Sequence, residues 1–162
     1  MPRETIMILD NETHSRWTLK ALLESERYLV VAVDSVERAL RDFSEFRIEG
    51  FITEYWVGGA STADVIKEVK TRFPGCYVMI LTDKDLREKD YEELLGAGVD
   101  DFFSKPASSR KILLHLERGL GRRKDSTATA PIAQDNSTLE LGRQPGCGIE
   151  KGLGLQPEGG GQ

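Results

Sequence analysis

The sequence predicts an α/β fold of three layers, in which a parallel sheet is covered by helices on both faces. Two observations support this prediction. Short apolar runs alternate with segments whose apolar residues recur at helical spacing, and the connections between them are short. Such alternation is typical of parallel sheets, because each crossover between parallel strands needs a connection long enough to hold a helix.

Five runs rich in apolar or β-branched residues predict the strands. The first is continuously apolar, as expected for a strand buried on both faces, and it ends at Asp10. The second is rich in β-branched side chains, which favour strands. The third is the central one and ends in a carboxylate, Glu54. In chain order, the predicted strands are residues 6–9, 28–33, 50–54, 76–81 and 99–104.

The helices are predicted by apolar side chains that repeat every three or four residues and so form one stripe on each helix. Asp34 to Glu37 resembles a capping box for the second helix, and Ser61 is predicted to cap the third. Gly96 or Gly98 ends the fourth. The stripes are Leu19, Leu22 and Leu23; Val36, Ala39, Leu40 and Phe43; Val65, Ile66, Val69 and Phe73; Tyr91, Leu94 and Leu95; and Ile112, Leu113, Leu116 and Leu120.

Five strands and five helices in alternation predict a (βα)5 doubly wound parallel sheet of the flavodoxin-like type, with strand order 2-1-3-4-5. Right-handed crossovers would bring the carboxyl ends of strands one, three, four and five to the same edge, called the rim below. Open α/β sheets place their ligands and their chemistry at this edge. Glu54, at the end of the central strand, is therefore the residue to explain.

Composition predicts one globular domain, residues 1–122, followed by a tail. The chain has 162 residues, and half of its 16 glycines lie in the last forty positions, which carry no aromatic side chain. We therefore expect residues 123–162 to be disordered, since they cannot bury enough apolar surface to offset their ordering entropy. A less favoured alternative makes the tail a docking peptide, with its apolar contacts supplied by Leu139, Leu141, Ile149, Leu153 and Leu155.

Charge and hydropathy narrow the class of function. The formal net charge is −5 and no basic stripe is visible, so we expect no nucleic-acid partner. There is no signal peptide pattern and no apolar run long enough to span a bilayer, so we expect no membrane association and a cytoplasmic location.

Polar residues gather at the predicted rim from four strands. The set comprises carboxylates, an amide, a hydroxyl and an ammonium group, and consists of Asp10, Asn11, Glu12, Glu54, Thr82, Asp83 and Lys105. In order and spacing, three segments resemble the receiver domain of bacterial response regulators over residues 5–121. These segments are Ile6-Met7-Ile8-Leu9-Asp10-Asn11-Glu12, Ile80-Leu81-Thr82, and Phe103-Ser104-Lys105-Pro106.

The resemblance implies a role for each matching position. In the family, an acidic pair and a backbone carbonyl hold magnesium, and an aspartate that ends the third strand accepts phosphate from a histidine kinase. A threonine and a lysine then contact the phosphoryl group, and an aromatic residue switches position. By position, the metal ligands fall on Asp10, Asn11 and Trp56, the phosphoacceptor on Glu54, the hydroxyl and the lysine on Thr82 and Lys105, and the switch aromatic on Phe102.

This sequence departs from the family pattern at four positions. Glu54 replaces the acceptor aspartate, and its extra methylene moves the carboxylate by about 1.5 Å, enough to spoil an aligned attack. Asn11 replaces an acid and weakens a magnesium site. Asp83 adds charge near the point of phosphate entry, and Trp56 adds bulk beside it. We therefore expect no cofactor, or at most weakly bound magnesium.

The favoured hypothesis is an atypical receiver that signals by protein contact and is not an enzyme. Glu54 would reach Lys105 and Thr82 and partly imitate phosphoaspartate. Its partner would be a histidine kinase or an output protein, and a second copy of the chain could pair with it through the last helix. Three alternatives stay open: a conventional phosphate switch with Glu54 or Asp10 as a weak acceptor, a small enzyme or flavin binder, and a purely structural Glu54–Lys105 pair.

Overall fold

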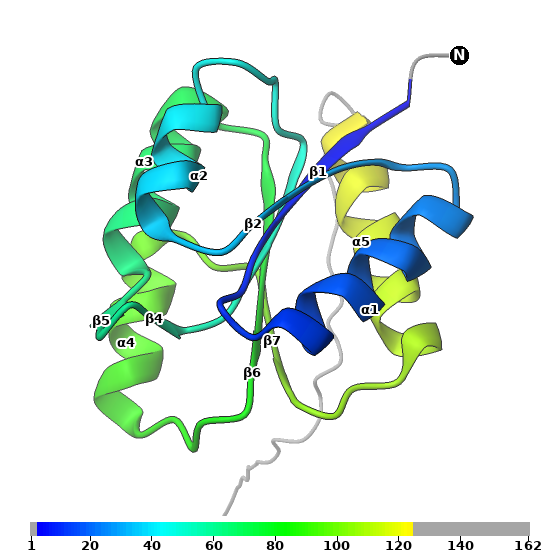
Figure 1. The fold of residues 1–162 in the computed structure, drawn as a ribbon. Helices are drawn as coiled ribbons and strands as arrows, with labels where there is room; N and C mark the ends of the chain where they lie inside the picture. The colour runs from blue at the N-terminus through cyan, green and yellow to red at the C-terminus, as the bar shows by residue number, and fades with distance from the viewer. Residues whose placement is uncertain (1–2, 125–162) are drawn as a thin grey trace, which may run out of the picture. The chain divides into compact units, whose positions relative to one another are not determined.

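The structure is a computed structural model that describes residues 3–124. Its main sheet has five parallel strands in the order β2-β1-β3-β6-β7 (Figure 1). When only the predicted strands are counted, this is the order 2-1-3-4-5, so the predicted topology is confirmed. The strands are β1 (Thr5–Leu9), β2 (Leu29–Val33), β3 (Gly50–Thr53), β6 (Tyr77–Thr82) and β7 (Asp101–Ser104).

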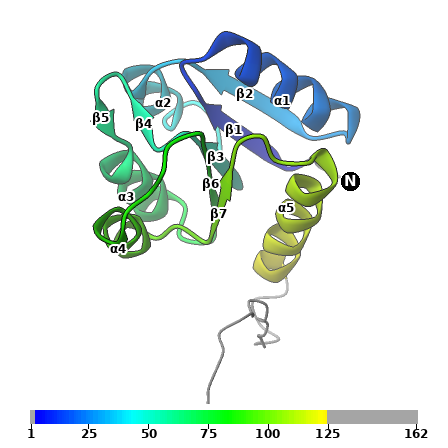
Figure 2. The same cartoon turned by 90° about the horizontal axis from the view of Figure 1, so that it is seen from below.

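Five helices cover the two faces of this sheet, as predicted. Helices α1 and α5 lie on one face, and α2, α3 and α4 lie on the other (Figures 1 and 2). Their bounds are α1 (Thr13–Ser25), α2 (Val36–Asp42), α3 (Ala63–Arg72), α4 (Glu88–Ala97) and α5 (Ser109–Lys124).

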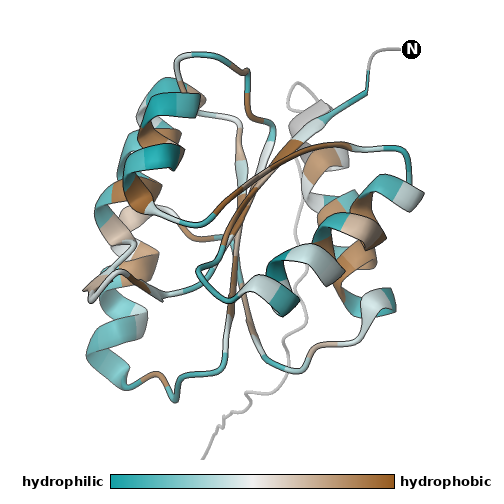
Figure 3. Ribbon diagram, in the orientation of Figure 1, coloured by the Kyte–Doolittle hydropathy of each residue, from teal (hydrophilic) through white to brown (hydrophobic). Residues whose placement is uncertain are grey.

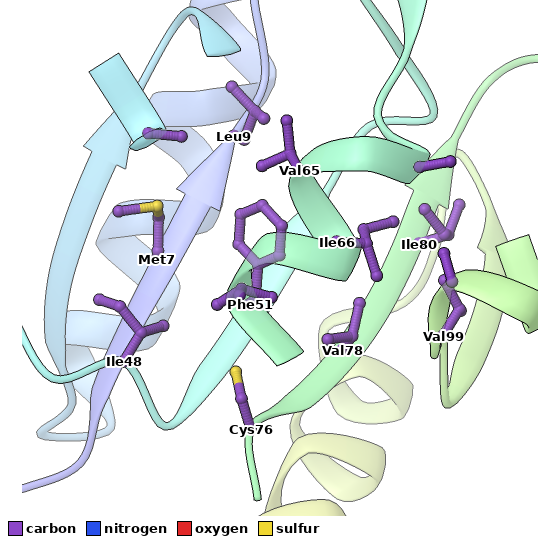
Figure 4. Packing of buried hydrophobic residues seen from close by; sticks show 14 of the residues in the cluster. Met7, Leu9, Ile48, Phe51, Val65, Ile66, Cys76, Val78, Ile80 and Val99 are labelled. Atoms are coloured by element: carbon purple, nitrogen blue, oxygen red, sulfur yellow. The ribbon is translucent and has the colours of Figure 1, made fainter. Parts of the chain in front are cut away.

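Each face of the sheet has its own apolar core, because the strands send alternate side chains to opposite sides. Phe51 lies at the centre of the core beneath α2, α3 and α4, where it packs with Met7, Val78 and Ile66 (Figure 4). The second core, beneath α1 and α5, includes Ile6, Ile8, Ile52, Met79 and Leu116. The strands are accordingly coloured mostly as hydrophobic in Figure 3, whereas the helix ribbons are hydrophilic over much of the side that faces away from the sheet.

Several boundaries differ from the prediction. The third strand ends at Thr53, so Glu54 is the first residue beyond it, and the last strand begins at Asp101 instead of residue 99. The N-cap of α3 is Thr62, whose hydroxyl does not cap the helix, whereas the Ser61 hydroxyl accepts a hydrogen bond from the Ala63 amide at 3.0 Å. These shifts of one or two residues arise because propensity does not fix where a hydrogen-bond ladder ends.

The loop after β3 contains a small hairpin that the sequence pattern did not predict. Strands β4 (Trp56–Val57) and β5 (Ala60–Ser61) pair antiparallel across Gly58 and Gly59, which both have positive φ. A two-residue turn with positive φ at both positions favours glycine, and the Gly-Gly pair was the available signal. The predicted stop at Gly98 is confirmed, since this residue ends α4 in the left-handed conformation at φ 112°.

Two further expectations concern the ends and the surface of the fold. Residues 123 and 124 belong to α5, and the rest of the predicted tail lies outside the described residues. Within residues 3–124, no helix is both long and apolar enough to cross a membrane.

Candidate functional site

The strand register brings the predicted site residues to one edge of the sheet. Leu9 lies beside Thr53 in the β1–β3 pair, and Thr82 lies beside Ser104 in the β6–β7 pair. The residue that follows each strand is then held by a backbone hydrogen bond. The Glu54 amide donates to the Leu9 carbonyl at 2.9 Å, and the Lys105 amide donates to the Thr82 carbonyl at 2.8 Å. The rim is thus fixed by the sheet itself.

Lys105 lies between two buried carboxylates at this rim. Its Nζ is 2.8 Å from Asp10 Oδ2 and 3.3 Å from Glu54 Oε2. The exposed side-chain fractions are 8% for Asp10, 7% for Glu54 and 18% for Lys105. The predicted contact between Glu54 and Lys105 is present, and Asp10 is the nearer of the two acids.

The electrostatic balance favours the charged form of this lysine. Burial lowers the pKa of Lys105, but the hydrogen bond and charge of Asp10, followed by those of Glu54, outweigh that effect and raise the pKa above its usual value. The ammonium group therefore stays protonated at neutral pH and neutralises part of the charge of two acids.

The Glu54 carboxylate is also tied to its own loop. Its Oε1 atom accepts a hydrogen bond from the Tyr55 amide at 2.7 Å, while Oε2 faces Lys105. The Glu54 carbonyl accepts from the hydroxyls of Thr53 and Thr62 at 2.8 and 2.9 Å. Glu54 is therefore held through both its backbone and its side chain.

The Thr82 hydroxyl bonds within its own loop in this structure. It is buried and accepts a hydrogen bond from the Lys84 amide at 3.1 Å. Among the described residues, no hydrogen bond joins Thr82 to Glu54, so the expected contact between them is absent from this structure. The physical reason is local: a threonine at a strand end readily bonds an amide two residues further along the chain.

Phe102 and Phe103 lie on opposite faces of β7, as alternation predicts. Phe103 packs with the core beneath α1 and α5, and Phe102 packs with the core beneath α4. The Phe102 ring meets the Tyr91 ring edge-on, with centroids 5.1 Å apart. Phe102 therefore connects the last strand to α4, and its role as a switch aromatic stays a prediction.

The three other candidate residues are more exposed. Asn11 and Asp83 are exposed, and Trp56 is 41% exposed on the β4–β5 hairpin. Asp83 and Lys105 both line an apolar cleft of about 480 Å³ between α1 and α5. Within residues 3–124, the ion pairs of Lys105 are with Asp10 and Glu54, and Asp83 forms none with it.

The residues at the rim, as arranged, do not fit a magnesium ion. Magnesium needs several oxygen ligands in octahedral geometry, and the nearest carboxylate oxygens already have partners. Asp10 Oδ1 accepts from the Glu12 amide at 2.9 Å, and its Oδ2 faces Lys105. Within residues 3–124, no group of three or more His, Cys, Asp or Glu side chains could hold a metal. In this arrangement the Lys105 ammonium, and not a metal ion, is the positive charge between the two acids.

Three residues at or beside the rim have contacts that the sequence did not reveal. Glu12 caps α1 by accepting from the amides of His14 and Ser15, and Arg16 Nη1 donates to the Asp10 carbonyl at 2.8 Å. Tyr55 is buried, and its hydroxyl reaches α4. The acids before α1 gave a weak signal for the cap, but no spacing rule pairs Tyr55 with a helix 35 residues away.

Solved structures share this fold. The receiver domain protein (CheY-like) of Methanospirillum hungatei JF-1 superposes with a TM-score of 0.73 at 18% identity, covering 77% of this chain and 99% of that chain. The beryllofluoride-activated NtrC4 receiver domain dimer gives a TM-score of 0.67 at 19% identity, covering 74% and 98%. Identities this low support the fold alone.

Two of the curated relatives are two-component response regulators, and a third is a phosphodiesterase with a segment similar to this chain. The response regulator ORR7 of Oryza sativa subsp. japonica is 31% identical over 62% of this chain, and PhoP of Pseudomonas aeruginosa is 26% identical over 93%. A cyclic di-GMP phosphodiesterase of Thermotoga maritima is 24% identical over 74% of the chain. The chain spans 49%, 66% and 32% of the length of these three proteins.

The family comparison covers most of the fold. The model of the response regulator receiver domain matches residues 6–117, which run from β1 into α5 and include every rim residue described above. The resemblance drawn from the sequence motifs is therefore confirmed: this chain belongs to the response regulator receiver domain family.

Proposed function

We propose that this receiver domain works in two-component signalling without phosphorylation, and that it acts on its partner by contact alone. The observation that carries the proposal is the Lys105 ammonium, which already bridges Asp10 and Glu54 within buried surroundings. In phosphoryl transfer, a lysine and a metal neutralise charge that develops on the phosphoryl group. Here the lysine is engaged before any phosphate arrives.

The surroundings of Glu54 support this proposal. A carboxylate that attacks phosphorus needs one oxygen exposed and aligned with the leaving group. The whole residue is 6% exposed, with one oxygen bound to the Tyr55 amide and the other facing Lys105. Freeing either oxygen would break a charge-assisted contact in a site from which water is largely excluded.

The imitation of phosphoaspartate that we propose is limited to the lysine. Glu54 reaches Lys105 but not Thr82, whose hydroxyl bonds the Lys84 amide instead. A glutamate also carries one charge, fewer than a phosphoryl group. We therefore propose that a kinase or output protein recognises the face formed by α4, β7 and α5. The conformation of this face would not depend on phosphorylation. On these three elements, Tyr91 and Leu114 are exposed, and the partly buried Phe102 ring packs against Tyr91.

A conventional switch is the second candidate, and one observation favours it. Asp10, Thr82 and Lys105 are all present at the rim, and Asp10 is itself a buried carboxylate that could accept phosphate in place of Glu54. The two candidates differ in whether a stable phosphoryl group is gained.

The deciding experiment exposes the full chain to acetyl phosphate with magnesium and follows its intact mass. We expect no stable gain of a phosphoryl group by the natural protein. A gain that disappears in Glu54→Gln, or in Asp10→Asn, would overturn the proposal and identify the acceptor.

The matched variant for this experiment is Glu54→Asp, which restores the shorter acid. We expect the shortened carboxylate to lie farther from Lys105, and we expect the variant to accept phosphate to a small extent. The double variant Glu54→Asp with Asn11→Asp should accept more, because it also restores an oxygen ligand charge for magnesium. Acceptance by these variants, but not by the natural chain, would locate the block at the substituted positions.

A further inference from the structure

Tyr55 is a buried residue whose two polar ends bond to different parts of the molecule. Its backbone amide donates to Glu54 Oε1 at 2.7 Å. Its phenol hydroxyl is 2.9 Å from Asp90 Oδ1 and 3.3 Å from Glu93 Oε1, both on α4. The residue is 6% exposed. It therefore spans the distance between the rim carboxylate and the helix.

We infer that Tyr55 is a positioning residue that couples the Glu54 carboxylate to α4 and so sets the position of that helix on the sheet. The inference rests on the proposed function, because it names the route by which the acid at position 54 reaches a binding face. This route does not pass through Thr82.

The backbone around Tyr55 leaves it little freedom. Its carbonyl accepts from the Thr62 amide at 2.9 Å and from the Thr62 hydroxyl at 3.1 Å. The Ser61 hydroxyl donates to Glu93 Oε2 at 3.2 Å, which ties the β4–β5 hairpin to the same helix. A shift of the Glu54 side chain that pulls on the Tyr55 amide must therefore move the phenol or the hairpin, and both contact α4.

The charges around the phenol keep this connection intact at neutral pH. Burial, together with hydrogen bonds and charges from Asp90 and Glu93, raises the pKa of Tyr55 to about 12, so the hydroxyl remains a donor. Hydrogen bonds from the Arg87 amide and from Tyr55 lower the pKa of Asp90, so its carboxylate remains an acceptor. Donor and acceptor are thus matched over the physiological range.

Helix α4 in turn carries groups that a partner would meet. Tyr91, one residue after Asp90, packs edge-on against Phe102 of β7. Tyr91 is 41% exposed and Leu95, one turn later, is 58% exposed. A rotation or shift of α4 would therefore move the exposed side chains of Tyr91 and Leu95. It would also change the packing of Phe102 against Tyr91.

The test is amide hydrogen exchange along residues 91–97 of the full chain, because exchange of helix amides reports local opening. We expect Tyr55→Phe to raise exchange in this segment by about tenfold, the effect of one lost hydrogen bond. Glu54→Ala should raise it in the same direction. The double variant should exceed the larger single effect by less than about twofold, because both changes break one connection.

Two controls separate coupling from a general loss of stability. Glu54→Gln keeps an oxygen that can accept from the Tyr55 amide, so exchange in α4 should stay near the natural rate. Tyr91→Phe removes an exposed hydroxyl that makes no hydrogen bond within the described part of the chain, and it should also leave α4 unchanged. Exchange in α1, on the other face, should not change in any of these variants.

Two results would overturn the inference. One is unchanged α4 exchange in Tyr55→Phe, and the other is full additivity of Glu54→Ala and Tyr55→Phe. If Tyr55→Phe does not fold, Glu93→Ala at the exposed end of the connection should raise α4 exchange about threefold, and no rise would have the same meaning. These results are independent of the phosphorylation experiment, so failure of one proposal is distinguishable from failure of the other.

Discussion

The lysine side and the threonine side of the rim behave differently. On the lysine side, Lys105 of the β7–α5 loop draws together an acid after β1 and an acid after β3. On the threonine side, the Thr82 hydroxyl bonds an amide of its own loop, only two residues away. One side joins three separate segments of the chain, and the other closes a turn.

This difference shows what a longer acid can and cannot replace. A charge interaction tolerates variation in distance and angle, so Glu54 satisfies Lys105 at 3.3 Å even as Asp10 holds the lysine more closely. A hydrogen bond to a hydroxyl needs an oxygen in a defined place. Glu54 supplies the first interaction without the second. Lys105 therefore neutralises part of the rim charge, while the Thr82 hydroxyl stays bonded within its own loop.

The largest effect should follow from Lys105→Met, which leaves Asp10 and Glu54 buried side by side without a cation. Removing one partner of a buried ion pair strands the charge of the other, so we expect the free energy of unfolding to fall by about 3 kcal/mol. Urea denaturation at neutral pH measures this change.

The matched control is Lys67→Met, because the Lys67–Asp64 pair is 3.9 Å long and largely exposed. Exposed pairs of this kind contribute about 0.3 kcal/mol. If the two substitutions cost the same, Lys105 behaves as a surface charge, and the contrast between the two sides of the rim is lost.

A smaller effect is expected from Tyr55→Phe, because Asp90 loses one hydrogen bond but its other oxygen still accepts from the Arg87 amide. Its signature is a pH dependence. The pKa of Tyr55 rises from 10.0 to about 12 on folding, so its contribution is complete below pH 10 and disappears as the pH rises towards 12. The stability difference between the natural protein and Tyr55→Phe should therefore shrink across this range. Lys105 titrates in both proteins and does not enter the difference.

Denaturation of both proteins at several pH values from 8 to 12 measures that difference. A constant gap over this range would mean that the phenol proton is not bound more tightly in the folded state, and the connection from the rim to α4 would lose its support.

Much of the fold followed from the sequence because the strongest signals are repetitive. Buried strands of a parallel sheet are continuously apolar, and helices on a sheet carry one apolar stripe, so residues 6–9 or the stripe of α3 were identifiable without coordinates. The β4–β5 hairpin was missed because two-residue strands carry no periodic signal. Strand ends shifted by one or two residues, which moved Glu54 from the last position of a strand to the first position of a loop.

The site was predictable where topology alone determines position. The ends of parallel strands meet at one edge, so Asp10, Glu54 and Lys105 could be placed together from the sequence. Which side-chain atoms then pair was not predictable, because a hydroxyl such as that of Thr82 has a local partner and a distant one that compete. The contact from Tyr55 to α4 was missed for a related reason, since it depends on the packing of a helix against a loop.

The smallest effect should come from Thr82→Val, which keeps the shape of the side chain and removes its hydroxyl. Within the described residues this hydroxyl bonds the Lys84 amide alone. Lys84 is exposed, so water can take the place of the hydroxyl at that amide. We expect a loss of about 0.5 kcal/mol in the free energy of unfolding and no change in α4 hydrogen exchange. A loss near that of Lys105→Met, or a clear rise in α4 exchange, would show that the threonine is coupled to the lysine side after all. A side chain that bonds only within its own turn should not affect a helix to which it is not bonded. Either result would therefore mean that the route from the rim to α4 runs through Thr82 as well as Tyr55.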